Sequence, residues 1–182
     1  LLNAASDDCF AGGSDASDQP SWVAYDNFTL NSTLGPQEGL WTKYYAGIYR
    51  ANLLLQKLDD APVEISTSFK ARLAAEAKFL RGFYYFELVR YFGSVPLLTE
   101  VVSVDEITTI TQNTPAEIYA QIESDLNTAR AASELPESVA PAEFGRITQG
   151  AVAALLGKVI LFQNNDSRMI EAANLFEEVI GS

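Results

Sequence analysis

Residues 76–98 constrain the fold of this chain more than any other stretch, because they combine helical spacing with an unusual density of aromatic side chains. One set of apolar residues recurs at steps of three and four, the spacing of one α-helical face. Its members are Leu73, Ala77, Leu80, Tyr84, Leu88 and Tyr91. A second stripe, Phe79, Phe83 and Phe86, predicts apolar contact on a further side. Gly93 is a typical helix stop and Pro96 prevents the helix from resuming, so a buried helix ending near residue 92 is expected.

Two helices are predicted in the first half of the chain. The first covers residues 38–58, with an inward face at steps of four and three. That face consists of Trp41, Tyr45, Ile48, Asn52 and Leu55, and Asp59, Asp60 and Pro62 break the helix. The second is the aromatic helix, capped by one of the residues 66–68. Residues 93–113 are expected to cross the surface and to pair briefly as a strand.

Three more helices are predicted after residue 113. Residues 114–117 read as a capping box with proline at the first helical position, followed by the buried stripe Ile118, Ile122, Leu126 and Ala129 and by a stop at Leu135-Pro136. The next helix starts at Thr148, and its small apolar residues 151–156 predict a central position. The last follows the turn at residues 164–166, with Met169, Ala173, Phe176 and Ile180 facing inward.

The fold class expected from these patterns is all-α, with a tetratricopeptide-like helical scaffold. An Ala/Leu-rich helix, a short Asn/Asp turn and a helix with Ala-x-x-x-Phe spacing are typical of such repeats. Residues 38–182 form this scaffold, and we expect residues 1–37, which show no lasting periodicity, to be loops with one short strand packed on it. Both ends look cut, so we expect a piece of a longer protein.

Composition excludes several functions. The 182 residues carry a net charge of −12 with only 12 Lys plus Arg, which argues against a nucleic-acid binder. Histidine is absent, which excludes Ser-His-Asp and Cys-His catalysis and a histidine zinc site. The single cysteine, Cys9, forms no internal disulfide, and Asp7 and Asp8 before it are unlike a lipid-anchor processing site. No cofactor is expected.

Four segments, in order and at matching spacing, resemble the SusD/RagB family of outer-membrane nutrient-binding lipoproteins. The first runs from Trp41 to the Arg50-Ala-Asn52 triplet, and the second joins Arg81 and its neighbours to the Tyr-Phe-Gly-Ser-Val-Pro run of residues 91–96. The others are residues 114–126 and residues 145–159. The resemblance covers nearly all of the chain from Asp7 onward but only the N-terminal half of a typical member.

The resemblance implies a SusD-like α-α superhelix and a non-enzymatic binding protein at the outer membrane of a Bacteroidetes-type cell. Members cap a SusC-type TonB-dependent transporter and deliver glycans or other nutrients to it. The lipid anchor lies outside this chain, and the helices form the scaffold and much of the transporter contact. Ligand residues come largely from irregular segments laid over that scaffold.

A candidate ligand site lies within residues 15–28. Sugar binding needs aromatic faces for the C–H sides of the rings and polar groups beside them for the hydroxyls. The candidate ligand-binding residues are Asp18, Trp22, Tyr25, Asp26 and Asn27. The alternative is that Trp22 and Phe28 pack this loop onto the helices.

Other conspicuous residues are expected to be structural. Trp41, Tyr44, Tyr45 and Tyr49 are expected in the core, and Arg81, Arg90, Arg50 and Asn52 as paired or buried polar residues that fix helix register and loop backbone. A calcium site at Asp7, Asp8, Asp15 and Asp18 lacks recognisable ligand spacing. The carboxylate pairs Asp59-Asp60 and Glu177-Glu178 point in different directions, which disfavours a glycosidase. Two hypotheses therefore remain besides that one: a glycan-binding protein, and a helical scaffold for protein contacts.

Overall fold

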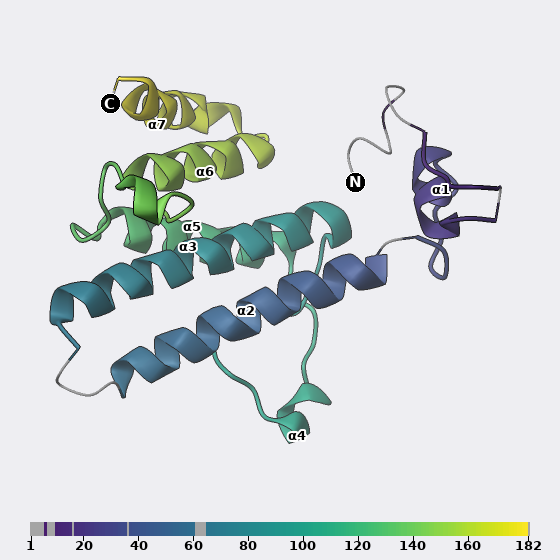
Figure 1. The fold of residues 1–182 in the computed structure, drawn as a ribbon, viewed down its shortest axis with the longest axis horizontal. Coiled ribbons are helices and arrows are strands. Elements are labelled where there is room, and N and C mark those ends of the chain that lie inside the picture. The colour runs from purple at the N-terminus through teal and green to yellow at the C-terminus, as the bar shows by residue number, and fades with distance from the viewer. Residues whose placement is uncertain (1–5, 7–9, 16, 36, 61–64, 182) are drawn as a thin grey trace. The chain divides into compact units, whose positions relative to one another are not determined.

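Every regular element among the described residues is a helix, in agreement with the all-α prediction. The computed structural model describes residues 6, 10–15, 17–35, 37–60 and 65–181. Its elements are α1 (Pro20–Asp26), α2 (Gln37–Asp59), α3 (Thr67–Phe92), α4 (Val104–Ile107), α5 (Pro115–Arg130), η2 (Pro141–Glu143), α6 (Gln149–Phe162), η3 (Asp166–Arg168) and α7 (Met169–Ile180) (Figure 1). The chain divides into two units, Leu1–Lys43 and Tyr44–Ser182, which are described separately. The calcium candidates Asp7 and Asp8, together with Cys9 and Pro62, lie outside the described residues.

Helix α3 begins and ends where its sequence predicts. The Ser66 side chain accepts a hydrogen bond from the Phe69 backbone N–H at 3.2 Å, and Gly93 takes the positive φ of 68° that ends the helix. The predicted faces are only partly correct. Leu80 is 38% exposed, whereas Tyr85 and its neighbours on α3 are buried, because α3 packs against α5 along a face rotated from the predicted stripe.

The Tyr84 ring of α3 packs against Gly47 of α2. A Cβ built on Gly47 would come within 2.4 Å of the Tyr84 ring, so a larger residue there requires the ring or the backbone to shift. Aromatic pairs extend the contact, with the Tyr45 and Tyr85 rings meeting edge to face at 6.5 Å between centroids. The predicted inward residues Ile48 and Asn52 are buried.

The α5, α6 and α7 helices form the other half of the second unit. Thr114 and Glu117 make the predicted capping box with Pro115 in the first turn, and the stripe Ile118, Ile122, Leu126 and Ala129 is fully buried. Helix α5 ends at Arg130, before the predicted Leu135-Pro136 stop, because the chain tightens into turns that bury Leu135. Thr148 caps α6, which contacts both α5 and α7 and is therefore central, as predicted.

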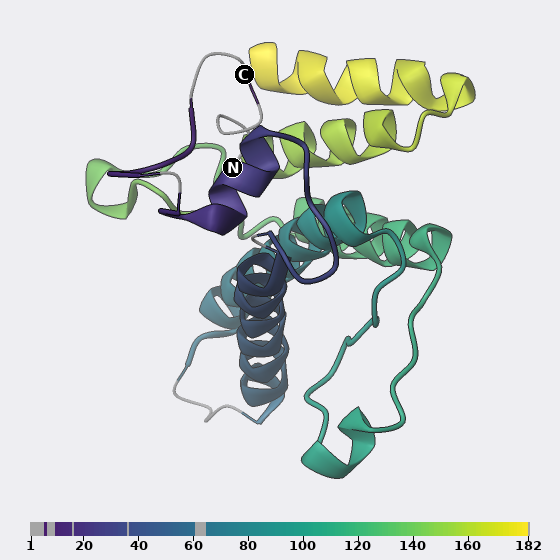
Figure 2. The same cartoon turned by 90° about the vertical axis from the view of Figure 1, so that its right-hand side faces the viewer.

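Helix α7 packs with a different face from the one predicted. Figure 2 shows it running beside α6 as the second arm of a helical hairpin. Ala172 and Leu175 are buried, whereas Met169 and Ile180 are 43% and 84% exposed and Ala173 is also exposed. Apolar residues occur around most of this helix, so spacing alone fits two registers. Phe176 is half-buried and fits against Gly157, where a Cβ would come within 2.8 Å of its ring.

Residues 94–113 form a hairpin that projects from the second unit and carries α4 at its tip (Figures 1 and 2). The strand pairing expected here is a single antiparallel bridge between Val95 and Asn113. The short α4 helix was not predicted, although its Ser103–Glu106 capping box has the same chemistry as the one that starts α5. Among the described residues, no helix is both long and apolar enough to cross a membrane.

Candidate functional site

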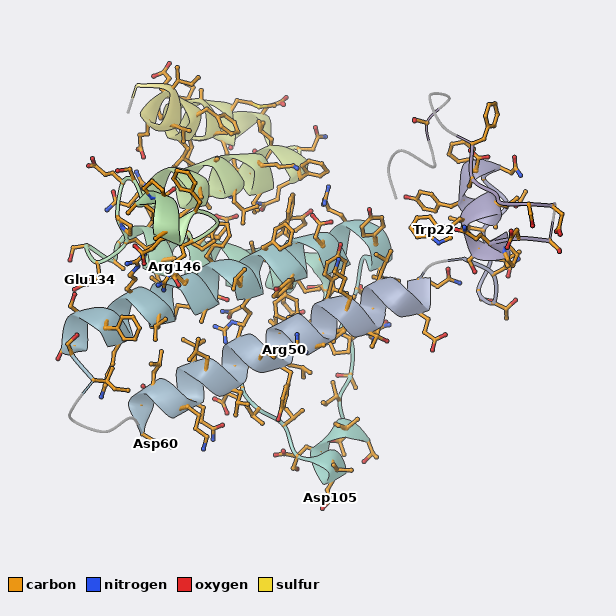
Figure 3. All side chains as sticks on the ribbon, in the orientation of Figure 1. Trp22, Arg50, Asp60, Asp105, Glu134 and Arg146 are labelled. Atoms are coloured by element: carbon orange, nitrogen blue, oxygen red, sulfur yellow. The ribbon has the colours of Figure 1, made fainter. Side chains whose placement is uncertain are left out.

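Three of the five candidate ligand residues lie on one short helix of the first unit. Residues 20–26 form α1 rather than the expected loop or strand, because Pro20 supplies the helical φ at the first position. Trp22, Tyr25 and Asp26 are spaced at i, i+3 and i+4, the spacing of one helix face. All three are half-buried, and Asn27 is the exposed C-cap residue (Trp22 is labelled in Figure 3). The structure therefore joins two rings and a carboxylate along one helix.

The acidic side chains near α1 hold the local backbone. Asp18 accepts hydrogen bonds from the backbone N–H and hydroxyl of Ser14, at 2.9 and 3.2 Å. Asp26 accepts one from the Ala11 N–H at 3.4 Å. Hydrogen bonds from Ser17 lower the pKa of Asp15, which keeps that carboxylate charged at the turn. Asp18 thus lies in the turn before α1 rather than on its Trp22 face.

Phe28 is a candidate ligand-binding residue that the sequence analysis considers only as a packing residue. However, 78% of it is exposed. It ends α1 in the left-handed region at φ 54°, where a bulky residue is strained. The Thr29 N–H donates to the Ala24 carbonyl across it, completing a Schellman-type stop. An exposed ring on strained backbone is typical of functional positions. The sequence signal for it is a helix that ends without glycine.

In the second unit, Arg81 is buried at the centre of a polar network. Its guanidinium donates to both Asp125 carboxylate oxygens at 2.7 Å, to the Asn52 side-chain oxygen at 2.8 Å and to the Thr99 carbonyl at 2.7 Å. Arg81 and Asp125 are 5% and 2% exposed. The predicted structural role of Arg81 is confirmed, and Asp125 is its partner.

The same network fixes the base of the hairpin. Asn52 donates to the Leu98 and Glu100 carbonyls at 3.0 Å, and the Tyr85 hydroxyl both donates to and accepts from Leu98. Burial raises the pKa of Tyr85 far above its ordinary value, so its hydroxyl stays protonated as a donor. The Tyr45 hydroxyl donates to the Pro96 carbonyl at 2.7 Å, and burial raises its pKa in the same way.

The predicted structural role is confirmed for Arg90, whereas the predicted burial is wrong for Tyr49 and Arg50. Arg90 pairs with Glu87 and lies over the Phe86 and Phe162 rings, at 4.5 and 5.0 Å from their centroids, which confirms its structural role. Tyr49 was expected in the core but is 50% exposed, and Arg50, labelled in Figure 3, is exposed rather than buried. Successive helical residues point in different directions, so Tyr49 and Arg50 turn away from the face that Ile48 and Asn52 share.

The described residues of the second unit form two hollows. One of about 270 Å³ lies between α2 and residues 99–101, with Gln56, Asp59 and Glu100 among its walls. The other, of about 510 Å³, lies among α5, α6 and α7, with Asn127, Arg130 and Gln149 among its walls. Among the described residues, no aromatic side chain lines either hollow.

The described residues offer little for metal binding or carboxylate catalysis. Within that part of the chain, no group of three or more His, Cys, Asp or Glu side chains is arranged to hold a metal ion. Asp59 and Asp60 are exposed at the end of α2, and Glu177 and Glu178 are exposed on α7, where Glu178 pairs with Arg130. These carboxylates are solvated, as their adjacent spacing predicts.

Comparison with known proteins gives consistent results. Residues 8–161 match the SusD-like family model described as "Starch-binding associating with outer membrane". SusD-like protein P2 of Formosa agariphila is 32% identical over 151 residues, which is 81% of this chain and 28% of that protein.

Solved structures agree over almost the whole chain. A laminarin-binding SusD-like protein is 43% identical with a TM-score of 0.89, over 99% of this chain and 37% of that one. Surface glycan-binding protein A from Bacteroides thetaiotaomicron, in complex with laminarihexaose, is 27% identical with a TM-score of 0.81, over 95% of this chain and 35% of that one. The chain thus spans between about a quarter and two fifths of these relatives' lengths.

Proposed function

We propose that this chain, which belongs to the SusD-like family, is part of a surface glycan-binding protein. In this proposal the protein captures an oligosaccharide and leaves it chemically unchanged. The observation that carries this proposal is the similarity, at 43% identity over 99% of the chain, to a laminarin-binding SusD-like protein. A second similar protein was solved in complex with laminarihexaose. A β-glucan of the laminarin type is therefore the ligand proposed for this protein.

The wider role proposed is delivery to a transporter. We propose that the parent protein is lipid-anchored, faces outward from the outer membrane, and passes its ligand to a SusC-type TonB-dependent transporter. The family model, which describes association with the outer membrane, supports this location. The chain's net charge of −12 suits such an exposed position, because it opposes self-association.

The ligand site is proposed on α1 and the residue that ends it. The rings of Trp22, Tyr25 and Phe28 offer apolar faces for the C–H sides of sugar rings. Asp26 and Asn27 offer hydrogen-bonding groups for hydroxyls, with Asp18 in the preceding turn. Phe28 is the most exposed of these rings, and a ring that stays in water before binding releases that water when a sugar covers it.

Affinity electrophoresis tests the proposal directly. The chain is run through native gels that contain laminarin, and through gels with starch or without polysaccharide. Retardation by laminarin is expected, with a loss of at least about tenfold in affinity for Trp22→Ala and for Phe28→Ala. Tyr49→Ala is the matched control, because Tyr49 is an exposed aromatic residue of α2.

The outcomes separate the site from the function. Retardation that survives both Trp22→Ala and Phe28→Ala would reject α1 as the site and leave the function standing. A chain that no polysaccharide retards would contradict glycan binding by this part of the protein. It would favour the alternative of a helical scaffold that makes only protein contacts.

A further inference from the structure

The hollow among α5, α6 and α7 exists because the residues at its floor are small. Ala131, Gly150 and Ala153 line it from the end of α5 and from α6. A Cβ built on Gly150 would meet no atom within 4 Å, so the space above this glycine is open. The hollow's volume of about 510 Å³ lies within the range of about 300–1,000 Å³ that small-ligand pockets occupy.

The rim of the hollow carries hydrogen-bonding groups that the fold leaves available. Asn127 and Glu137 are exposed, and no hydrogen bond among the described residues involves either side chain. Gln149 donates through its side-chain amide to the Leu135 carbonyl at 2.8 Å, which fixes its orientation and leaves its side-chain oxygen free to accept. Donors and acceptors therefore stand together at one opening.

Charge at the rim narrows the class of ligand. The Arg130 guanidinium and the Glu178 carboxylate meet at 2.5 Å, joining α5 to α7, and both are about half exposed. Glu137 adds a second carboxylate, so the charged lining consists of two acids and one base. This excess of negative charge disfavours phosphates and acidic sugars. A neutral polyhydroxyl compound fits better, because each hydroxyl both donates and accepts.

We propose that this hollow is a second saccharide-binding site, separate from α1 and formed entirely by the scaffold helices. One sugar ring rests its C–H side on the Ala/Gly floor while its hydroxyls bond to Asn127, Gln149 and the acidic rim. Among the described residues no aromatic side chain lines the hollow, so the ring stacking of a principal sugar site is missing here. The site therefore binds weakly and acts as an accessory contact for a long glycan whose principal site is elsewhere. The inference rests on the proposed glycan-binding function and extends it to a new surface.

An NMR titration with laminarihexaose tests this site apart from α1. The backbone amide of Gly150 and the side-chain amides of Asn127 and Gln149 report on the hollow, and the indole N–H of Trp22 reports on α1. Saturable shifts are expected at the hollow with a dissociation constant of about 1–10 mM. Gly150→Leu fills the open space and should weaken this binding at least about tenfold, without changing the shifts at Trp22.

Gly150→Ala is the matched control, since it adds only one methyl group and should retain the binding. Shifts at the hollow that are retained in Gly150→Ala and lost in Gly150→Leu support the second site. Shifts at Trp22 with no change at the hollow would overturn the inference and leave the proposed function intact. Absence of shifts at both places, in a chain whose circular dichroism spectrum shows it folded, would overturn both for this glycan.

Discussion

Replacing Arg81 by leucine should be among the most damaging single changes in the second unit. The change removes two hydrogen bonds to Asp125, one to Asn52 and one to the Thr99 carbonyl. Asp125, 2% exposed, is left as a buried carboxylate without its counter-charge. Breaking a buried ion pair from one side costs about 3–5 kcal/mol, against a total of about 5–15 kcal/mol for a typical domain.

Urea unfolding followed by circular dichroism measures this loss as a change in the free energy of unfolding. The matched control is Arg130→Ala, which breaks a half-exposed pair with Glu178 and should cost no more than about 1 kcal/mol. If Arg81→Leu leaves too little folded protein, Asp125→Asn keeps the shape and removes one charge. It should still destabilise measurably, because the buried guanidinium is then unpaired.

A double mutant separates the ion pair from the packing. Arg81→Leu combined with Asp125→Leu removes both charges, so its loss should be smaller than the sum of the two single losses. A cost of less than about 1 kcal/mol for Arg81→Leu, with an unchanged urea slope, would refute the reasoning. So would single losses that simply add, because the two side chains would then act independently.

Three further perturbations test other parts of the second unit. Gly82→Leu should lower the free energy of unfolding by about 1–3 kcal/mol, since even a Cβ would lie 3.3 Å from Leu126; an unchanged melting temperature would contradict this packing. Thr114→Ala should cost about 1 kcal/mol in urea unfolding through loss of the α5 cap, whereas an unaltered midpoint would mean that the capping box is dispensable. Hydrogen bonds from Arg168 lower the pKa of Glu123 below its ordinary value of 4.5, so its stabilisation is present above about pH 4.5 and is lost as pH falls through the folded-state pKa. Glu123→Gln should flatten that acid-side fall, and an identical pH profile would exclude a contribution from this pair.

Local signals in the sequence predicted most helix positions. Three helix ends are set by hydrogen bonds between near neighbours in the sequence: the capping box at Thr114, the cap at Thr148 and the stop at Gly93. The local residues are therefore enough to predict where these helices begin or end. Helix α1 was missed because its N-cap residue, Gln19, makes no side-chain cap, and because Phe28 ends it where glycine is usual.

Faces and partners were harder to predict than helix positions. Leu80 and Met169 fit an inward stripe by spacing but are exposed, because a helix with apolar residues on several sides takes its orientation from its neighbours. The pairing of Arg81 with Asp125 joins residues 44 positions apart, which no local pattern specifies. The candidate ligand residues were located on a loop, and only the structure joins Trp22 and Tyr25 along one helix.

Among the described residues, the hydrogen bonds that join α2 and α3 to the hairpin of residues 94–113 lie at its base. The hydrogen bonds that Asn52, Arg81 and Tyr85 make to the hairpin go mainly to its backbone. They therefore fix the backbone conformation of residues 98–100 but require few particular side chains there. At the tip, α4 is capped by its own Ser103–Glu106 capping box, and none of its residues is buried. Insertions and substitutions at the tip should therefore be tolerated, as at other exposed loop ends. Evolution or protein design can therefore change the tip of this hairpin while the packing of α2, α3 and α5 stays the same.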